Sequence, residues 1–362
     1  MAKKDSGAMN VPLPDSDDVE NPTIGVPEPK YEWMGLTNEW GTRVKPDEYG
    51  LRLGALNVGI YGEVPEFWDD QTRRPRGALP RPGVPPLPYN LRAKHQMWAD
   101  SSADLYEEGI QRRWVPATDV PWDSLEALPE EIERAVCQVA TELMQCANTE
   151  IEIVTYWQDQ MSYGYYEVKQ FLATVTFDCA RHIEALRKRA LSNGGGLGVE
   201  SHGRVNRMIL ESSGGWTESV CYTYLIRGTY QMHLLRGLLA NAHNDAESYI
   251  YARMIQDHAR HLTYGYDHLK YAVTHQEGET AILRTLLAIG EAHLTTELDR
   301  SATKPAMAII LGGGIEGGKT LGIETYLHLV GDFVRDYMKA CEWLGVDRTE
   351  MFNPRLAQYL EY

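Results

Sequence analysis

The sequence has few of the features that mark secreted, membrane or nucleic-acid-binding proteins. Its five cysteines are an odd number and lie mostly within helical patterns, which predicts reduced core thiols. No apolar run approaches the roughly twenty residues that a membrane helix needs, and the opening MAKKDSGAMNVPLPDSDD has no apolar core for export. Basic residues are scarce: 35 Lys and Arg face 51 Asp and Glu, and the net charge of −16 argues against nucleic acid. We therefore expect a cytoplasmic protein without a membrane or nucleic-acid partner.

Composition also divides the 362 residues into segments. Residues 1–30 are polar and acidic, which predicts a disordered tail or one that wraps a partner. Residues 31–90 are rich in aromatic side chains and then in proline, which predicts an extended arm. That arm either grips another subunit or straps its own domain. We assign residues 91–345 to one helical domain and residues 346–362 to a C-terminal tail.

From Leu91 onward, apolar residues recur at helical spacing, and no alternating pattern of useful length predicts a strand. Pro129 is a typical helix opener, and Gly214-Gly215 precedes a capping position at Thr217. We therefore predict an all-α fold with a four-helix core and additional helices. The expected helices span 91–114, 129–160, 163–192, 216–243, 245–275, 278–300 and 318–344.

Two nearly identical five-residue stretches lie inside the third and fifth of these helices. They read DCARH at Asp178–His182 and DHARH at Asp257–His261. Positions three and four apart share a helix face, so both closing histidines fall on apolar stripes. A buried imidazole needs partners for its ring nitrogens, and the neighbouring Asp and Arg side chains are candidates.

The repeated pattern resembles Asp-Glu-x-Arg-His, the signature of the ferritin-like di-iron carboxylate proteins. These include ribonucleotide reductase small subunits, hydroxylases of soluble multicomponent monooxygenases and bacterial ferritin-like oxidases. The segment from Trp114 to Trp122 is also similar to a helix-ending segment of that family. The resemblance implies a ferritin-like bundle, in which two helices each carry Glu-x-x-His and two each carry a single Glu. Here Cys179 and His258 stand where the family has glutamate.

The two single-glutamate positions of the resemblance fall at Glu150 and Arg227. Glu150 lies on an apolar helix stripe, 29 residues before Cys179 (179 − 150). Arg227 lies 31 residues before His258 (258 − 227), so the two halves of the core mirror each other. We expect Arg227, a permanent cation, to pair with Glu150.

One glutamate, a cysteine, an arginine and a histidine supply too few carboxylates for two hard ferric ions, so we expect no di-iron centre in this chain. The resemblance implies that Asp178 and Asp257 hold His261 and His182 by hydrogen bonds. Two interpretations stay open for the centre, and a working dinuclear oxygenase is a third. A metal-free relic network would contain Asp178, Cys179, Arg181, Arg227, Asp257 and Arg260. A site for a single Fe, Zn or Mn ion would contain Glu150, His182, His258 and His261.

Two hypotheses of function follow, and neither assigns a catalytic residue. In the first, the chain is a ligand-depleted, non-catalytic subunit that assembles with a ligand-complete homologous di-iron oxygenase subunit, or otherwise forms a homodimer. In the second, it is a metal-dependent oxidoreductase that uses the single-ion site. The run from Gly313 to Thr320 fits the nucleotide P-loop pattern, but no βαβ unit surrounds it, so we expect no nucleotide site.

Overall fold

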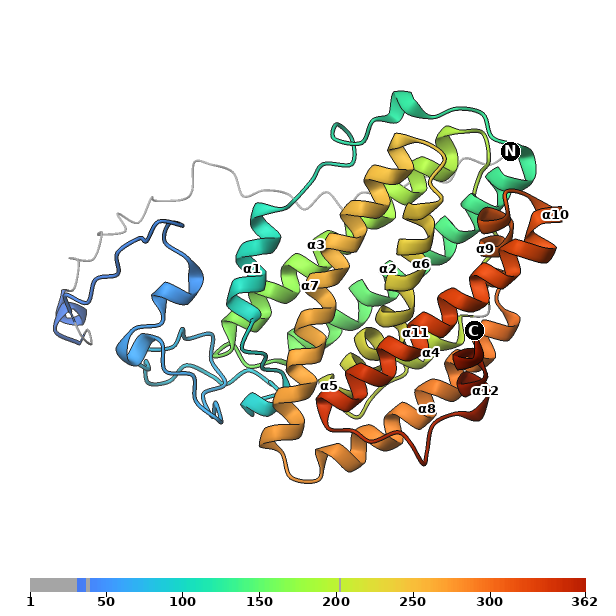
Figure 1. Ribbon diagram of the computed structural model, residues 1–362. Helices are drawn as coiled ribbons and strands as arrows, with labels where there is room; N and C mark the ends of the chain where they lie inside the picture. Colours follow the sequence, from blue (N-terminus) through green and yellow to red (C-terminus); the bar gives the residue numbers. More distant parts are fainter. Residues whose placement is uncertain (1–30, 37–39, 202) are drawn as a thin grey trace, which may run out of the picture. The chain divides into compact units, whose positions relative to one another are not determined.

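The computed structural model describes residues 31–36, 40–201 and 203–362, so the predicted tail at 1–30 lies outside the described residues. The chain divides into two compact units, residues 1–41 and 42–362. In the described part of the first unit, Glu32–Leu36 form the short 3-10 helix η1. The helices discussed below all belong to the second unit (Figure 1).

Four long helical segments form the core of the second unit, and they run alongside one another (Figure 1). No β-strand occurs in the described part of the chain, so the all-α prediction is confirmed. The core segments begin and end close to the predicted residues. They are α2 (Glu130–Gln160), α3 (Tyr166–Ser192), a third segment made of α5 (Trp216–Val220), η6 (Cys221–Gly228) and α6 (Thr229–Ala240), and α7 (Asp245–His275).

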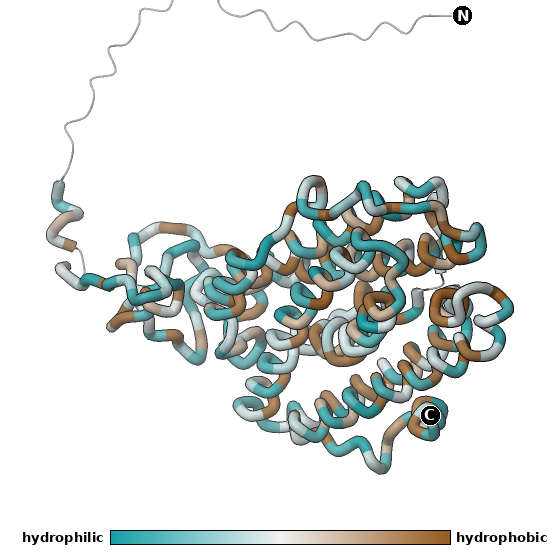
Figure 2. Tube along the Cα trace, turned by 45° about the horizontal axis from the view of Figure 1, so that its top comes forward, coloured by the Kyte–Doolittle hydropathy of each residue, from teal (hydrophilic) through white to brown (hydrophobic). Residues whose placement is uncertain are grey.

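Local signals explain where these helices start. Pro129 directly precedes α2, whose first turn carries three glutamates that suit the positive end of the helix dipole. The Asn244 side chain caps α7 by accepting a hydrogen bond from the backbone N–H of Glu247 at 2.9 Å. Along each helix, hydrophobic and hydrophilic positions alternate in short stretches, the pattern of helices with one buried face (Figure 2).

The third core segment contains a π-helical stretch, η6, between two α-helical parts. A π-helical stretch changes which side chains share a face relative to a regular α-helix. Every residue of η6 is buried, including Arg227. The face that Arg227 occupies is therefore set by a feature that helical periodicity in the sequence does not reveal.

The prediction of a helix over residues 91–114 is wrong for its first part. Only α1 (Ser102–Gln111) is α-helical there, and a 3-10 turn, η4, covers Lys94–Gln96. The backbone before α1 is bound to other segments: the N–H groups of Asn90 and Leu91 donate to the carbonyl of Gln160 at 3.0 and 2.9 Å. These long-range hydrogen bonds replace those that a helix would make.

The proline-rich arm packs on its own domain. It contains the 3-10 helices η2 (Leu53–Leu56) and η3 (Gly59–Tyr61). The backbone N–H of Leu53 donates to Glu107 on α1 at 2.6 Å, and Arg76 forms a buried ion pair with Glu167 on α3. Within the second unit, residues 42–90 of the arm therefore contact their own domain, and a contact of the arm with another subunit stays a prediction.

Smaller helices surround the core, and the α-helices α4, α9, α10 and α12 fall where no helix was predicted. No helix of the described residues is both long and apolar enough to cross a bilayer. The surrounding elements are η5 (Trp122–Ser124), α4 (Arg204–Leu210), α8 (Glu279–Arg300), α9 (Thr303–Gly312), α10 (Ile315–Gly317), η7 (Gly318–Gly322), α11 (Ile323–Leu344), α12 (Pro354–Ala357) and η8 (Gln358–Glu361).

The glycine run that resembles a P-loop is explained by helix packing. A P-loop follows a β-strand, whereas helix α9 precedes this run. A Cβ on Gly322 would lie 2.0 Å from the carbonyl oxygen of Ala308, and one on Gly318 would lie 3.2 Å from the same carbonyl. These glycines allow the beginning of the α11 segment to pack directly on the backbone of α9.

Candidate metal and charge centre

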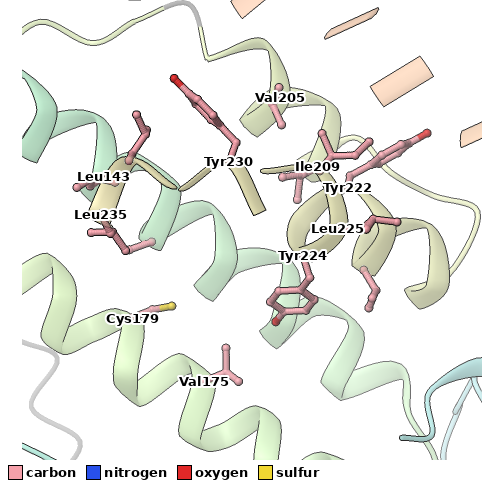
Figure 3. Packing of buried hydrophobic residues seen from close by; sticks show 14 of the residues in the cluster. Leu143, Val175, Cys179, Val205, Ile209, Tyr222, Tyr224, Leu225, Tyr230 and Leu235 are labelled. Carbon is pink, nitrogen blue, oxygen red and sulfur yellow. The ribbon is translucent and has the colours of Figure 1, made fainter. Parts of the chain in front are cut away.

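The residues singled out in the sequence meet in the interior of the four-helix core. Each of them is at most 4 % exposed. Glu150 comes from α2, the first five-residue stretch from α3, Arg227 from η6 and the second stretch from α7. Figure 3 shows Cys179 on α3 among the buried side chains of this interior. The ten residues are Glu150, Asp178, Cys179, Arg181, His182, Arg227, Asp257, His258, Arg260 and His261.

Two aspartates and two arginines join α3 to α7 in a closed ring of ion pairs. Arg181 pairs with Asp178 on its own helix and lies 3.3 Å from Asp257 on the other. Arg260 mirrors it, pairing with Asp257 on its own helix and lying 2.9 Å from Asp178 across the gap. Each buried carboxylate thus has two guanidinium partners, which offsets the free-energy cost of burying the charges.

Each aspartate also contacts the histidine of the opposite helix. His182 Nε2 lies 3.0 Å from Asp257 Oδ2, and His261 Nε2 lies 3.3 Å from Asp178 Oδ2. These are the two cross-helix pairs that the family resemblance suggested. They fix the orientation of both imidazole rings and direct the Nδ1 side of each ring away from its aspartate.

Trp114 completes this network, although the sequence marked it only as part of a helix-ending segment. Its indole N–H donates to Asp257 Oδ2 at 3.0 Å, and its carbonyl accepts from Arg181 Nη1 at 3.0 Å. A tryptophan three residues after the end of a helix gives no sign of the two partners it will reach. Its contribution depends on how the loop between α1 and α2 folds over the middle of α3 and α7, where Arg181 and Asp257 lie.

Glu150 lies between two positively charged groups. Its Oε2 is 3.6 Å from Arg227 Nη2, and its Oε1 is 3.0 Å from His261 Nδ1. Neither contact has hydrogen-bond geometry. Arg227 Nη2, Glu150 Oε1 and His261 Nδ1 all lack a hydrogen-bond partner among the described residues. Burial alone would raise the pKa of Glu150, but its interactions with the charged groups of His261 and Arg227 outweigh it and hold that pKa well below its usual range.

The histidines on α7 are pushed in opposite directions by their surroundings. Burial lowers the pKa of His258 to about 3. Burial also acts to lower the pKa of His261, but Glu150 and Asp178 raise it to about 9. The two ring centroids lie 5.5 Å apart, and His258 Nε2 has no hydrogen-bond partner in the described part of the chain. The helix therefore presents one neutral and one positively charged imidazole to the same interior space.

Within the described residues, the side chains that converge with metal-ligand geometry are Glu150, Cys179 and His261. One oxygen, sulfur or nitrogen atom from each lies within 4.8 Å of the others. Two members of the predicted quartet, His182 and His258, are outside this group, and Cys179 joins it. Asp257 holds His182 through Nε2, just as Asp178 holds His261, so the position of each ring and not the aspartate contact separates the two histidines.

Further polar groups of the same interior come from η6 and α4, and the sequence did not single them out. The hydroxyl of Tyr224 is buried without a hydrogen-bond partner among the described residues. Figure 3 places Tyr224 near Cys179 and Val175 of α3. Asn206 on α4 accepts a hydrogen bond from Arg227 Nη1 at 3.0 Å. These groups are positioned by the π-helical stretch and by the packing of α4. Helical spacing in the sequence predicts neither of these two features.

A di-iron centre does not fit these residues. Asp178 and Asp257 are held by both arginines of the ring, and Glu150 is the remaining carboxylate of the ten. Hard ions and their bridging oxygens need several carboxylate ligands. The guanidinium of Arg227, 3.6 Å from Glu150, also places a fixed positive charge where a second ion would have to bind.

The fold and the centre together define an all-α protein whose four-helix core buries a histidine-containing, charge-balanced cluster. No family model matches the sequence, and no curated protein matches it. The chain is similar to three solved structures of R2-like ligand-binding oxidases, two of them mutants described with an aerobically reconstituted Mn/Fe cofactor. One such mutant has a TM-score of 0.41 and 13 % identity over 71 % of this chain and 89 % of its own. The other has a TM-score of 0.40 and 14 % identity over 71 % of this chain and 90 % of its own.

Proposed function

We propose that this chain is a non-catalytic helical subunit that assembles with a homologous, ligand-complete subunit in an oxygenase or oxidase complex. The observation that carries the proposal is the position of Arg227, 3.6 Å from Glu150 in the middle of the core. At the corresponding position the family resemblance has a glutamate. A permanent cation there excludes the paired irons through which such a complex would activate oxygen.

The balance of buried charge supports a structural role for the centre. Three carboxylates (Glu150, Asp178 and Asp257) face three guanidinium groups (Arg181, Arg227 and Arg260), so these six charges cancel, and the charged His261 adds one positive charge. A core that needed two multivalent cations would instead carry excess negative charge. The cross-helix ion pairs join α3 to α7 directly, and this structural role does not depend on catalysis.

The outer face of α8 supports assembly with another chain. Every exposed residue between positions 280 and 292 is uncharged, although the chain as a whole carries a net charge of −16. Ile282 is 53 % exposed and Ile289 is 44 % exposed, and the two lie two helical turns apart on one face. An uncharged stripe of this kind on an outer helix is typical of a surface that packs against another helix.

The test is purification of the tagged full-length chain from its native source, with mass spectrometry of the chains that elute with it. We expect a homologue with two intact Asp-Glu-x-Arg-His motifs to elute in stoichiometric amount. The double substitution Ile282→Glu and Ile289→Glu should remove it. Leu321→Glu, at a residue 62 % exposed on η7, is the matched control and should retain it.

Recovery of the chain without such a homologue, and with two iron ions per chain, would contradict the proposal. A partner that persists in both the α8 variant and the control would contradict only the assignment of α8 as its docking surface.

A second candidate function, a metal-dependent oxidoreductase, is favoured by the convergence of Glu150, Cys179 and His261. This function requires a redox-active ion such as iron or manganese in the purified chain. Elemental analysis together with oxygen consumption distinguishes it from the first proposal: stoichiometric iron or manganese with turnover supports the oxidoreductase, and the absence of both supports the non-catalytic subunit.

A further inference from the structure

We infer that Glu150, Cys179 and His261 form a site for one thiophilic divalent cation, and that Zn²⁺ is the ion that fits the donors best. The inference concerns the centre alone and does not depend on the partner proposed above. The site would be mononuclear and would differ in ligands from the quartet predicted from sequence.

The donor atoms come from different helices and converge. Glu150 lies on α2, Cys179 on α3 and His261 on α7, and their ligand atoms lie within 4.8 Å of one another. Thiolate, imidazole and carboxylate are the three ligand types that Zn²⁺ takes in proteins. The thiolate disfavours Mn²⁺ and Mg²⁺, which prefer oxygen ligands.

Unsatisfied polar atoms point to a bound ion. Glu150 Oε1, His261 Nδ1 and His258 Nε2 are buried, and none of them has a hydrogen-bond partner among the described residues. Glu150 Oε1 and His261 Nδ1 lie 3.0 Å apart without hydrogen-bond geometry, and buried polar atoms are nearly always paired, so these two atoms beside one thiol call for a common partner. A single cation would bind both of them once His261 has lost its proton.

Neighbouring contacts orient these donors. Asp178 binds His261 at Nε2, 3.3 Å away, which leaves Nδ1 of the ring for the site. Arg227 approaches Oε2 of Glu150 and not Oε1, so one carboxylate oxygen remains available for the ion. Arg227 therefore prevents a second ion and a bridging carboxylate, yet it allows one ion to bind.

The charges balance for one divalent ion. On binding, the S–H bond of Cys179 and the Nδ1–H bond of the charged His261 imidazole break, both protons leave to solvent, and sulfur–metal and nitrogen–metal bonds form. The thiolate and the Glu150 carboxylate then carry two negative charges toward Zn²⁺, and the His261 imidazole binds as a neutral ligand. No oxidation or reduction takes place, because Zn²⁺ has no accessible redox state in proteins.

The test uses the full-length chain, stripped with a chelator and reloaded with ZnSO4 or CoCl2. We expect about one Zn²⁺ per chain by elemental analysis, and with Co²⁺ a thiolate-to-cobalt charge-transfer band in the near ultraviolet. Cys179→Ser should lower zinc affinity more than about tenfold and abolish the band. Cys341→Ser, at another buried cysteine, is the matched control and should keep both.

Circular dichroism of each variant establishes that it is folded, and Glu150→Gln provides a second variant that removes a charge without removing the thiol. Failure of the folded chain to bind zinc, or binding that Cys179→Ser and Glu150→Gln leave unchanged, would overturn the site. Loss of zinc binding with the homologous partner retained overturns only the metal site, whereas zinc without a partner overturns only the proposed assembly.

Discussion

Arg227 Nη2 lies 3.6 Å from Glu150 Oε2 in the interior of the four-helix core, and both side chains are at most 3 % exposed. This pair occupies the two positions at which the family resemblance has single glutamates. Glu150 thus matches one of the two acids of that resemblance, and Arg227, at the position of the other, is its counter-ion. The pair determines how much negative charge the core can offer to a metal.

Removal of Arg227 should therefore destabilise the metal-free chain. Arg227→Met leaves Glu150 buried without its guanidinium, and breaking one partner of a buried pair costs about 3–5 kcal/mol. The double variant with Glu150→Gln should recover part of this loss, because no uncompensated charge remains. Urea unfolding of the wild type, both single variants and the double variant measures the coupling. Strict additivity of the two substitutions would show that the pair contributes nothing.

The two ring aspartates offer a matched comparison. Asp178 and Asp257 are equally buried, and each contacts both arginines, but only Asp178 contacts His261. Asp178→Asn and Asp257→Asn should both lower the free energy of unfolding. Only Asp178→Asn should also weaken zinc binding, by about 10–100-fold, because it alone orients a ligand histidine. Competition with a chromophoric chelator measures this affinity, and equal effects of the two substitutions would contradict the assignment.

Packing around α9 gives a prediction about the glycine run. Gly322→Ala would place its Cβ 2.0 Å from the backbone oxygen of Ala308, which cannot rotate away. We expect a loss of about 1–3 kcal/mol or more, as for other overpacked sites. Gly54→Ala, with nothing within 4 Å of the added Cβ, is the control and should change stability little.

The same glycine run should bind no nucleotide. We expect no binding of a fluorescent ATP analogue to the wild-type chain, and Lys319→Ala should change neither this result nor the stability.

Much of the core was predictable because its signals are local. Apolar periodicity identified the four long helices, and the two five-residue stretches identified the residues that meet between them. The exchange of His182 for Cys179 in the metal-ligand group was not predictable. It depends on where the ligand atoms of α2, α3 and α7 lie in space, and helical spacing does not determine that.

The remaining differences have non-local causes as well. The π-helical stretch η6 sets the face that Arg227 and Tyr224 present, and no residue type signals it. The segment before α1 is extended because the backbone N–H of Leu91 donates to the carbonyl of Gln160 at the end of α2. These two residues are 69 positions apart in the sequence (160 − 91). Propensity within a short window favoured a helix there, and the long-range hydrogen bonds determined the structure.

A buried histidine outside the centre predicts how stability depends on pH. His268 is fully buried: its Nε2 accepts from the hydroxyl of Thr217 at 3.0 Å, and its Nδ1 donates to the carbonyl of Trp98 at 3.1 Å. Burial lowers the pKa of His268 to about 4, although the Trp98 carbonyl acts in the opposite direction. The unfolded chain, in which the histidine pKa is about 6.5, takes up this proton first as the pH falls.

Stability should therefore decrease as the pH falls from about 6.5 to about 4, and this group accounts for up to roughly 3 kcal/mol of the loss. His268→Gln removes the titrating group. The unfolding free energy should then depend less steeply on pH in this range, because up to one proton fewer is taken up on unfolding. Thr217→Ala removes a hydrogen bond but keeps the imidazole, so it should lower stability while the pH dependence persists. Urea unfolding at a series of pH values measures both, and an unchanged slope in His268→Gln would contradict a neutral buried imidazole.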